Sequence, residues 1–166
     1  MHQRDILTLY AFNWWANQRL LAAAARATQE PLMRPQQLCR GSILDTLVHI
    51  MSGEGGWRYK LETGVEMPIF DSERMAEFPT LEAVRKRWVE VEQALRAYLH
   101  RINDDDPNQT VTFRNREGKS FERVLWQPLL HVITPSTQHR AEVAEALTKL
   151  GYSPGNLDFE IYLREH

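Results

Sequence analysis

Apolar residues recur every three or four positions along several long stretches of the chain, which is the spacing of a helix with one buried face. The first stretch is DILTLYAFNWWANQRLLAAAARAT, residues 5–28. The second runs from Ser42 to about Thr63, and Ser42 with Asp45 has the spacing of a capping box. Because three glycines interrupt this stretch, we expect tertiary packing to hold it helical. The pattern therefore predicts two helices before residue 64.

Two more helices are expected in the second half. Thr80 is placed to cap a helix over LEAVRKRWVEVEQALRAYLHRI, residues 81–102. Its apolar positions step alternately by four and three residues, the seam of a helix that packs nearly parallel to its neighbours: Val84, Trp88, Val91, Leu95, Tyr98 and Ile102. A fourth helix is predicted from about Phe121 to Leu150, ending at Gly151.

The remaining segments are short. TVTFRNREGKSFE, residues 110–122, has β-branched and aromatic residues on both sides of a turn with Asn115 and Gly118, which predicts a β-hairpin. SPGNLDFEIYLREH, residues 153–166, predicts a short terminal helix that folds back through Leu157, Ile161 and Leu163. Residues 1–166 are thus expected to form a single all-α domain, a four-helix bundle with a small hairpin before the fourth long helix and a short C-terminal helix.

Composition narrows the possible environments and partners. The chain has 22 acidic and 20 basic residues in 166, a net charge of −2, and neither sign is segregated. We therefore expect no nucleic-acid or membrane partner, and no stretch has the roughly 18 apolar residues of a membrane span. The single cysteine, Cys39, cannot form an internal disulfide, which is typical of a cytoplasmic protein.

The sequence contains none of the common catalytic motifs, such as a nucleophile elbow, a phosphate-binding loop or an HExxH zinc motif. Nothing in the sequence places a base beside Cys39, so we expect this thiol to be inert. Three of the six histidines lie near helix or chain ends and need no function: His2, His100 and His166. His49, His131 and His139 remain, on two predicted helices, and helix bundles build metal sites from facing helices.

Four stretches of this chain resemble the DinB/YfiT-like superfamily of small bacterial four-helix bundles. In chain order these are LYAFNWWANQRLL, LVHIMSGEGGW, LLHVITPSTQHRAEVAEALTKLG and SPGNLDFEIYL. The resemblance covers nearly the whole chain. It implies a homodimer that binds a divalent metal through three histidines, and relatives include metal-dependent thiol transferases and isomerases, with hydrolases also suggested.

The family pattern has one histidine on helix two and two on helix four, four residues apart. His49 matches the first ligand, and His139, followed by Arg140, matches the last. Pro135 stands where the remaining histidine is expected, and Gln138 replaces a further, non-ligand histidine. The resemblance therefore implies a partly retained metal site, at which binding of zinc or nickel is weak or absent.

A third ligand has two main candidates on helix four. His131 lies about 12 Å along the axis and about 80° around it from His139 in a straight helix, although Pro135 is expected to kink the helix between them. Glu142 lies three residues after His139 on the same face, and Asp45 on helix two is another possible oxygen ligand. We predict the metal ligands to be His49 and His139, completed by His131 or Glu142.

Periodicity alone places His49 about 150° from the apolar stripe of Leu47 and Met51, so without the resemblance it would be a solvent-facing histidine. Aromatic residues at helical spacing usually pack in the core, as expected for Trp57, Trp88 and Trp126.

The sequence leaves two candidate functions open. One is a metal-dependent thiol transferase or hydrolase with an unknown small-molecule substrate. The other is a non-catalytic dimeric bundle that has lost the metal and binds a small ligand or a protein.

Overall fold

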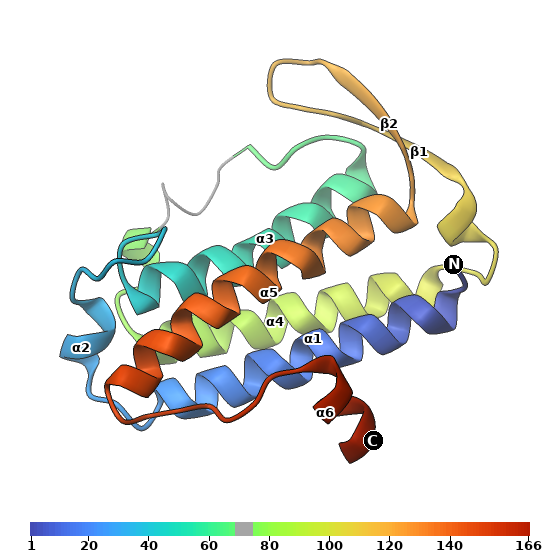
Figure 1. Ribbon diagram of the computed structural model, residues 1–166. Helices are drawn as coiled ribbons and strands as arrows, with labels where there is room; N and C mark the ends of the chain where they lie inside the picture. The colour runs from blue at the N-terminus through green and yellow to red at the C-terminus, as the bar shows by residue number, and fades with distance from the viewer. Residues whose placement is uncertain (69–74) are drawn as a thin grey trace.

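The computed structural model describes residues 1–68 and 75–166. In these residues four long helices form a bundle (Figure 1): α1 (Gln3–Ala24), α3 (Ile43–Thr63), α4 (Leu81–Arg101) and α5 (Trp126–Lys149). The shorter elements are α2 (Gln29–Met33), the 3₁₀ turns η2 (Met75–Glu77) and η3 (Asp106–Asn108), strands β1 (Thr110–Arg114) and β2 (Ser120–Val124), and α6 (Phe159–Glu165). This confirms the predicted all-α bundle with a hairpin and a short C-terminal helix.

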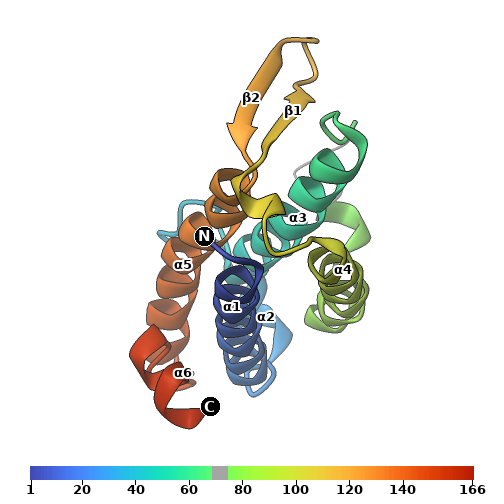
Figure 2. The ribbon, with the colours of Figure 1, turned by 90° about the vertical axis from the view of Figure 1, so that its right-hand side faces the viewer.

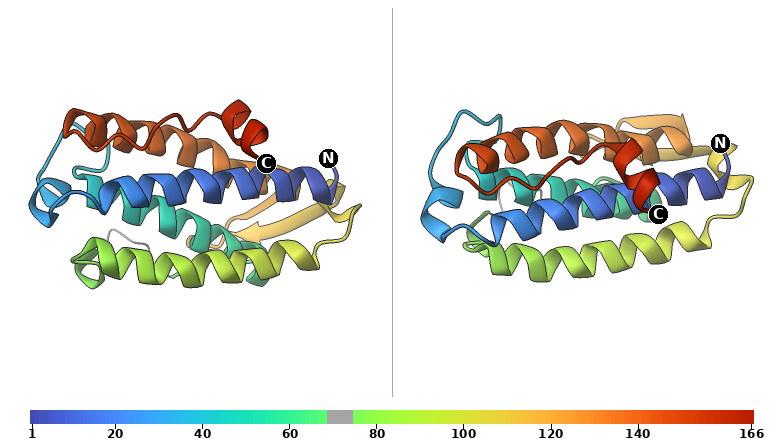
Figure 3. Two further views of the ribbon diagram at one scale, coloured as in Figure 1. Left: turned by 90° about the horizontal axis from the view of Figure 1, so that it is seen from below. Right: turned by 60° about the horizontal axis from the view of Figure 1, so that its bottom comes forward.

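The long helices pack in the order α1, α5, α3 and α4, with α4 returning to contact α1. α1 and α5 run in one direction and α3 and α4 in the other, and the hairpin extends from one end of the bundle (Figures 1 and 2). α6 lies against α1 on the outside (Figure 3). No helix in the described parts of the chain is long and apolar enough to cross a membrane.

The predicted caps at the starts of α3 and α4 are confirmed. Ser42 Oγ accepts a hydrogen bond from the backbone N–H of Asp45 at 3.0 Å, and Thr80 Oγ1 accepts one from Ala83 at 3.2 Å. Each hydroxyl pairs a backbone donor that the first helical turn leaves free. α3 ends at Gly64, whose φ of +73° is the left-handed conformation that glycine adopts without strain.

Inside the bundle the core consists of two apolar clusters, one toward each end, and a third, smaller cluster of Phe12, Ala16 and Tyr162 joins α1 to α6. One joins the C-terminal half of α1 to the first halves of α3 and α4 and the end of α5. The other joins the start of α1 to the end of α4 and the start of α5, and includes Tyr10, Leu99 and Leu129. The seam of α4 is buried as predicted, except that Leu99 rather than Tyr98 faces the core.

A buried layer of polar residues separates the two clusters, and we call it the polar layer: Asn13, Asn17, Glu54, Trp88 and Arg140. Glu54 Oε1 accepts hydrogen bonds from the amides of Asn13 and Asn17 at 2.6 and 2.8 Å, and its Oε2 accepts one from the indole of Trp88 at 3.0 Å. The Arg140 guanidinium donates to the side-chain oxygens of the same two asparagines. Two amides thus connect a buried cation to a buried carboxylate.

Three details of the prediction are wrong. α5 begins at Trp126 rather than Phe121, because residues 120–124 pair with β1 as the second strand of the hairpin. The proline-rich stretch after α1 contains the short helix α2, whose Leu32 is buried. In α6 the buried residue is Tyr162, against Phe12 of α1, whereas Leu163 is 49% exposed. The predicted continuation of this helix through Pro135 is confirmed, since α5 runs to Lys149.

Candidate metal centre

A tight turn before α3 brings Cys39 and Arg40 to the surface of the bundle. The N–H of Gly41 donates to the carbonyl of Leu38 at 3.0 Å, so Cys39 and Arg40 are the two central residues of the turn. Gly41 has a φ of +95°, which a residue with a side chain rarely adopts. The turn thus presents the thiol toward α5 and the guanidinium toward α3.

Cys39, His139 and Glu142 form a group in which one ligand atom from each lies within 4.8 Å of the others. The Nδ1 of His139 is 3.5 Å from Cys39 Sγ and 3.7 Å from Glu142 Oε2. The two α5 residues share a face because they are three positions apart. The imidazole of His139 is only 7% exposed, whereas Cys39 is exposed. We call this group the open cluster.

Two separations in the open cluster are close to those around one tetrahedral metal ion. Zinc bonds of about 2.3 Å to sulfur and about 2.0–2.2 Å to nitrogen and oxygen place neighbouring ligand atoms about 3.4–3.6 Å apart. His139 Nδ1 lies 3.5 Å from the sulfur and 3.7 Å from the carboxylate oxygen, and all three ligand atoms lie within 4.8 Å of one another. A thiolate, an imidazole and a carboxylate also make a mixed donor set that suits zinc better than magnesium or calcium.

His49 lies beside the open cluster but is not part of it. Its ring meets that of His139 edge to face, with the centroids 4.8 Å apart. Its Nε2 is 3.0 Å from the Arg40 guanidinium. Because a guanidinium can only donate, Nε2 acts as the acceptor and the ring proton is assigned to Nδ1. For His49 to bind a metal through Nε2, Arg40 would have to move.

A cavity of about 300 Å³ adjoins the open cluster, and we call it the metal pocket. His49 and His139 line one part of it, and Pro135 lines it between α3 and α5. His131 and Trp57 line another part, and the His131 ring packs edge to face on Trp57, with the centroids 5.0 Å apart. The size is at the lower end of the range for small-molecule sites.

The surroundings shift the pKa values of two groups at this site. Desolvation, followed by the charge of Arg40, lowers the pKa of His49 from 6.5 to about 4, so this imidazole is neutral at pH 7. Desolvation and the nearby Glu142 carboxylate raise the pKa of the Cys39 thiol. A bound cation would favour the thiolate instead, because a metal-coordinating thiol loses its proton.

The structure brings together only some of the residues that the sequence singled out. His139 and Glu142 share the open cluster, His49 adjoins it, and His131 lies on Trp57 at the boundary of the metal pocket. Cys39 is the residue that sequence reasoning missed, because it is 100 residues from His139 in the chain. One available signal was its position directly before Arg40 and Gly41, where a turn can precede the helix that carries His49.

Comparison with known proteins agrees with this architecture. The sequence model of the DinB family matches residues 1–166 of this chain. "Protein DinB" of Bacillus subtilis (strain 168) is 24% identical to this chain over 160 residues, which cover 93% of this chain and 91% of that protein.

Proposed function

This chain belongs to the DinB family. We propose that it binds a divalent metal ion through Cys39, His139 and Glu142, and that it acts as a metal-dependent thiol transferase or hydrolase. Zinc is the ion that best suits this donor set. The proposal differs from the three histidines implied by sequence resemblance, since a thiolate and a carboxylate take the places of two of the imidazoles. His49 is then a neighbour of the metal rather than one of its ligands.

The observation that carries the proposal is the open cluster itself. Three chemically suitable ligand atoms from two distant parts of the chain lie within 4.8 Å of one another at the edge of a cavity of about 300 Å³. Three protein ligands are the usual number in catalytic zinc sites, which keep a further position for water or substrate. Structural sites commonly have four.

The neighbouring residues have roles that follow from their charges. When bound, the metal would supply a Lewis acid that activates a thiol or a water molecule. The guanidinium of Arg40 lies at the metal pocket and offers a fixed positive charge to an anionic group of a substrate. His49 is neutral at pH 7 and accepts from Arg40, so it holds that guanidinium in place.

A second candidate is a non-catalytic dimeric bundle that has lost the metal and binds a small ligand or a protein. Arg40 and Pro135 favour it. Pro135 occupies the position of a family ligand, and the Arg40 cation beside His49 opposes a metal cation there. The two candidates differ in whether the open cluster binds metal.

Cobalt substitution tests the choice. Protein purified without a metal-affinity tag would be stripped with a chelator and titrated with Co²⁺, whose absorption reports both tetrahedral geometry and thiolate ligation. We expect one equivalent to bind with a sulfur-to-cobalt charge-transfer band. Cys39→Ser should lose this band, and His139→Ala should lose most of the binding.

The matched control is His100→Ala, which removes an exposed histidine from the end of α4 and should leave the titration unchanged. Absence of stoichiometric Co²⁺ and Zn²⁺ binding in the unsubstituted protein would overturn the proposal and favour the second candidate. Binding that survives Cys39→Ser with its spectrum unchanged would exclude the thiolate as a ligand.

A further inference from the structure

A second, larger cavity lies at the hairpin end of the bundle, and we call it the hairpin pocket. Its volume is about 480 Å³, within the range of small-molecule sites. The end of α3, the hairpin and the start of α5 line it, and Figure 1 shows these three elements at the same end of the molecule. The site proposed above does not use this cavity.

The register of the hairpin determines which side chains line the hairpin pocket. Phe113 pairs with Phe121, and Val111 pairs with Arg123. Directly opposed residues of an antiparallel pair lie on the same face, and alternate residues of a strand share a face. Phe113, Phe121 and Arg123 therefore share one face of the hairpin, and all three line the cavity.

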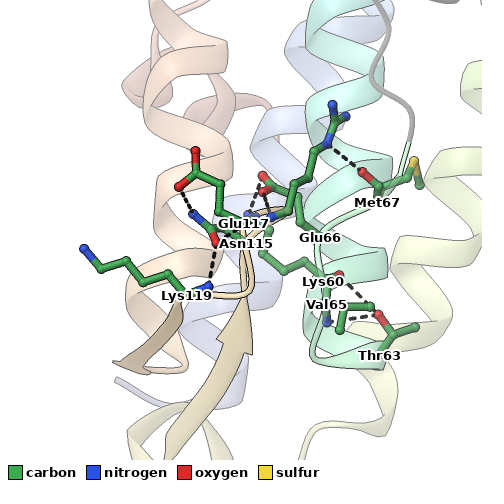
Figure 4. Close-up of polar contacts among 9 residues, drawn as sticks. Lys60, Thr63, Val65, Glu66, Met67, Asn115, Glu117 and Lys119 are labelled. Carbon is green, nitrogen blue, oxygen red and sulfur yellow. Dashed lines mark hydrogen bonds and ion pairs between the residues drawn. The ribbon is translucent and has the colours of Figure 1, made fainter.

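The segment after α3 fixes the hairpin against the bundle. The N–H of Arg114 donates to the carbonyl of Gly64 at 2.8 Å, and the N–H of Glu66 donates to the carbonyl of Arg114 at 2.9 Å. Glu66 Oε2 also accepts from the backbone N–H of Arg116 at 3.1 Å, within the set of polar contacts that Figure 4 shows around the turn. The wall of the hairpin pocket is thus held by backbone hydrogen bonds.

Lys60 places an ammonium group in this largely aromatic cavity. It is only 8% exposed, and its Nζ lies 4.2 Å from the centre of the Trp57 ring and 5.4 Å from that of Phe113. Nζ donates to Glu66 Oε1 at 3.2 Å. An ammonium has three donors, and among the described residues this is the one hydrogen bond recorded for it. Lys60 can therefore still donate to a ligand.

The charges of the hairpin pocket do not cancel. Lys60 and Glu66 form an ion pair, with side chains 10% and 19% exposed. Arg123 lines the same cavity, donates to the carbonyl of Glu122, and has no carboxylate partner among the described residues. The hairpin pocket therefore combines aromatic walls with one cation in excess.

We propose that the hairpin pocket binds small aromatic anions, with the ring against the aromatic wall that Trp57, Phe113 and Phe121 form by packing on one another, and the anionic group at Lys60 and Arg123. Apolar walls with a few convergent polar groups are typical of ligand sites. A flat ring would contact the three aromatic side chains, and each cation would attract the negative group.

The two cavities adjoin, because Trp57 and His131 line both of them. This extends the function proposed above. The hairpin pocket would hold the aromatic, anionic end of the substrate, and the metal pocket would hold the end that reacts. This link rests on the proposed function, whereas binding of an aromatic anion to the hairpin pocket does not.

The test compares two probes with the same ring system, 2-naphthoate and the neutral 2-naphthylmethanol, by calorimetric titration of the metal-free protein. We expect 2-naphthoate to bind at least about fivefold more tightly, the effect of about 1 kcal/mol from a partly exposed charge pair. Arg123→Gln should remove this preference, and Lys60→Met should reduce binding of the anion. Arg87→Gln, the same change at an exposed arginine of α4, should have no effect.

Equal binding of the two probes, no binding of 2-naphthoate at millimolar concentration, or an unchanged preference in Arg123→Gln would each overturn the proposal. Because Arg123 is exposed, its substitution should leave the fold intact, and the thermal transition checks this. The metal-free protein is used so that a failed metal site and a failed hairpin pocket give different results. A missing metal leaves 2-naphthoate binding intact, and a missing anion site leaves cobalt binding intact.

Discussion

His139 and Arg140 are consecutive residues of α5, yet their side chains belong to two different polar sites. Arg140 lies in the polar layer, 2% exposed, and donates to Asn13, Asn17 and Thr137. His139 lies in the open cluster, where its Nδ1 is 3.5 and 3.7 Å from a sulfur and a carboxylate oxygen. A rotation of 100° along one helix separates two kinds of polar arrangement.

The difference lies in how closely the protein pairs its own polar atoms. In the described residues the buried side-chain N and O atoms without a partner are those of Trp14 and Arg58, and neither belongs to the polar layer. The polar layer is therefore complete without a ligand. The contacts of the open cluster are longer: the backbone N–H of Cys39 donates to Glu142 Oε2 at 3.4 Å, Cys39 Sγ lies 3.5 Å from His139 Nδ1, and Nδ1 to Oε2 at 3.7 Å is too long for a hydrogen bond. Closely paired networks stabilise a fold, and loosely paired, solvent-accessible ones are candidates for binding.

Arg140→Met should have the largest effect on the free energy of unfolding. Removing the guanidinium leaves the fully buried Glu54 carboxylate without its cation, and breaking a buried pair in this way costs about 3–5 kcal/mol. Desolvation already raises the pKa of Glu54 and lowers that of Arg140 to about 10. Urea unfolding of the metal-free protein measures the loss.

Arg87→Met is the control for this experiment, because Arg87 forms an exposed pair with Glu90 three residues away on α4. Such pairs contribute less than about 1 kcal/mol. A loss below about 1 kcal/mol for Arg140→Met would contradict the view that the polar layer is part of the structural core.

His139→Ala should have the opposite profile, with a large effect on metal binding and a small one on stability. Loss of a ligand should weaken zinc binding at least about 100-fold, since removing even an outer-shell partner commonly costs 10–100-fold. The unfolding free energy of the metal-free protein should fall by about 1–2 kcal/mol, less than for Arg140→Met, because truncating the buried imidazole leaves a cavity but no unpaired charge. Competition with a chromophoric chelator measures the affinity. Unchanged zinc affinity would show that His139 is not a metal ligand.

Pro135→His should strengthen metal binding by at least about tenfold. Position 135 is four residues before His139, and Pro135 lines the metal pocket together with His139 and His49, so an imidazole there can join them. The change also restores the backbone N–H that proline lacks. Competition with a chromophoric chelator, on both proteins purified without a nickel column, measures the change in zinc affinity. Equal affinities would contradict the prediction and show that the protein does not need the missing histidine.

The sequence predicts the fold well because the long helices carry their own signals. The caps Ser42 and Thr80 are local features and lie where they were expected, and the apolar seam of α4 is buried as expected except that Leu99 takes the place of Tyr98. The start of α5 was placed too early because Phe121 fits an amphipathic helix as well as a strand. Phe121 lies in a strand because it pairs with Phe113 on β1, and local periodicity does not report such a contact between strands.

The candidate site could be predicted only where it lies within one helix. His139 and Glu142 share a face of α5 by their spacing alone, and so were named together. Cys39 was not, because its contact with His139 depends on how the turn before α3 packs against α5. His49 shows where periodicity within one helix misleads. It predicted a solvent-facing side chain, whereas in the structure the side chain is half-buried against His139 of another helix.

The smallest expected effect is a pH dependence of stability that comes from His49, beside the open cluster. The pKa of His49 is lowered to about 4 in the folded, metal-free protein, against 6.5 when unfolded. Between these values the unfolded chain binds the proton more tightly, so the unfolding free energy should fall as pH drops from 6.5 to 4. Because His49 is only half-buried, solvent screening reduces this loss to about 1 kcal/mol. Urea unfolding at several pH values, compared with His49→Gln, isolates the contribution, and parallel curves for the two proteins would contradict it.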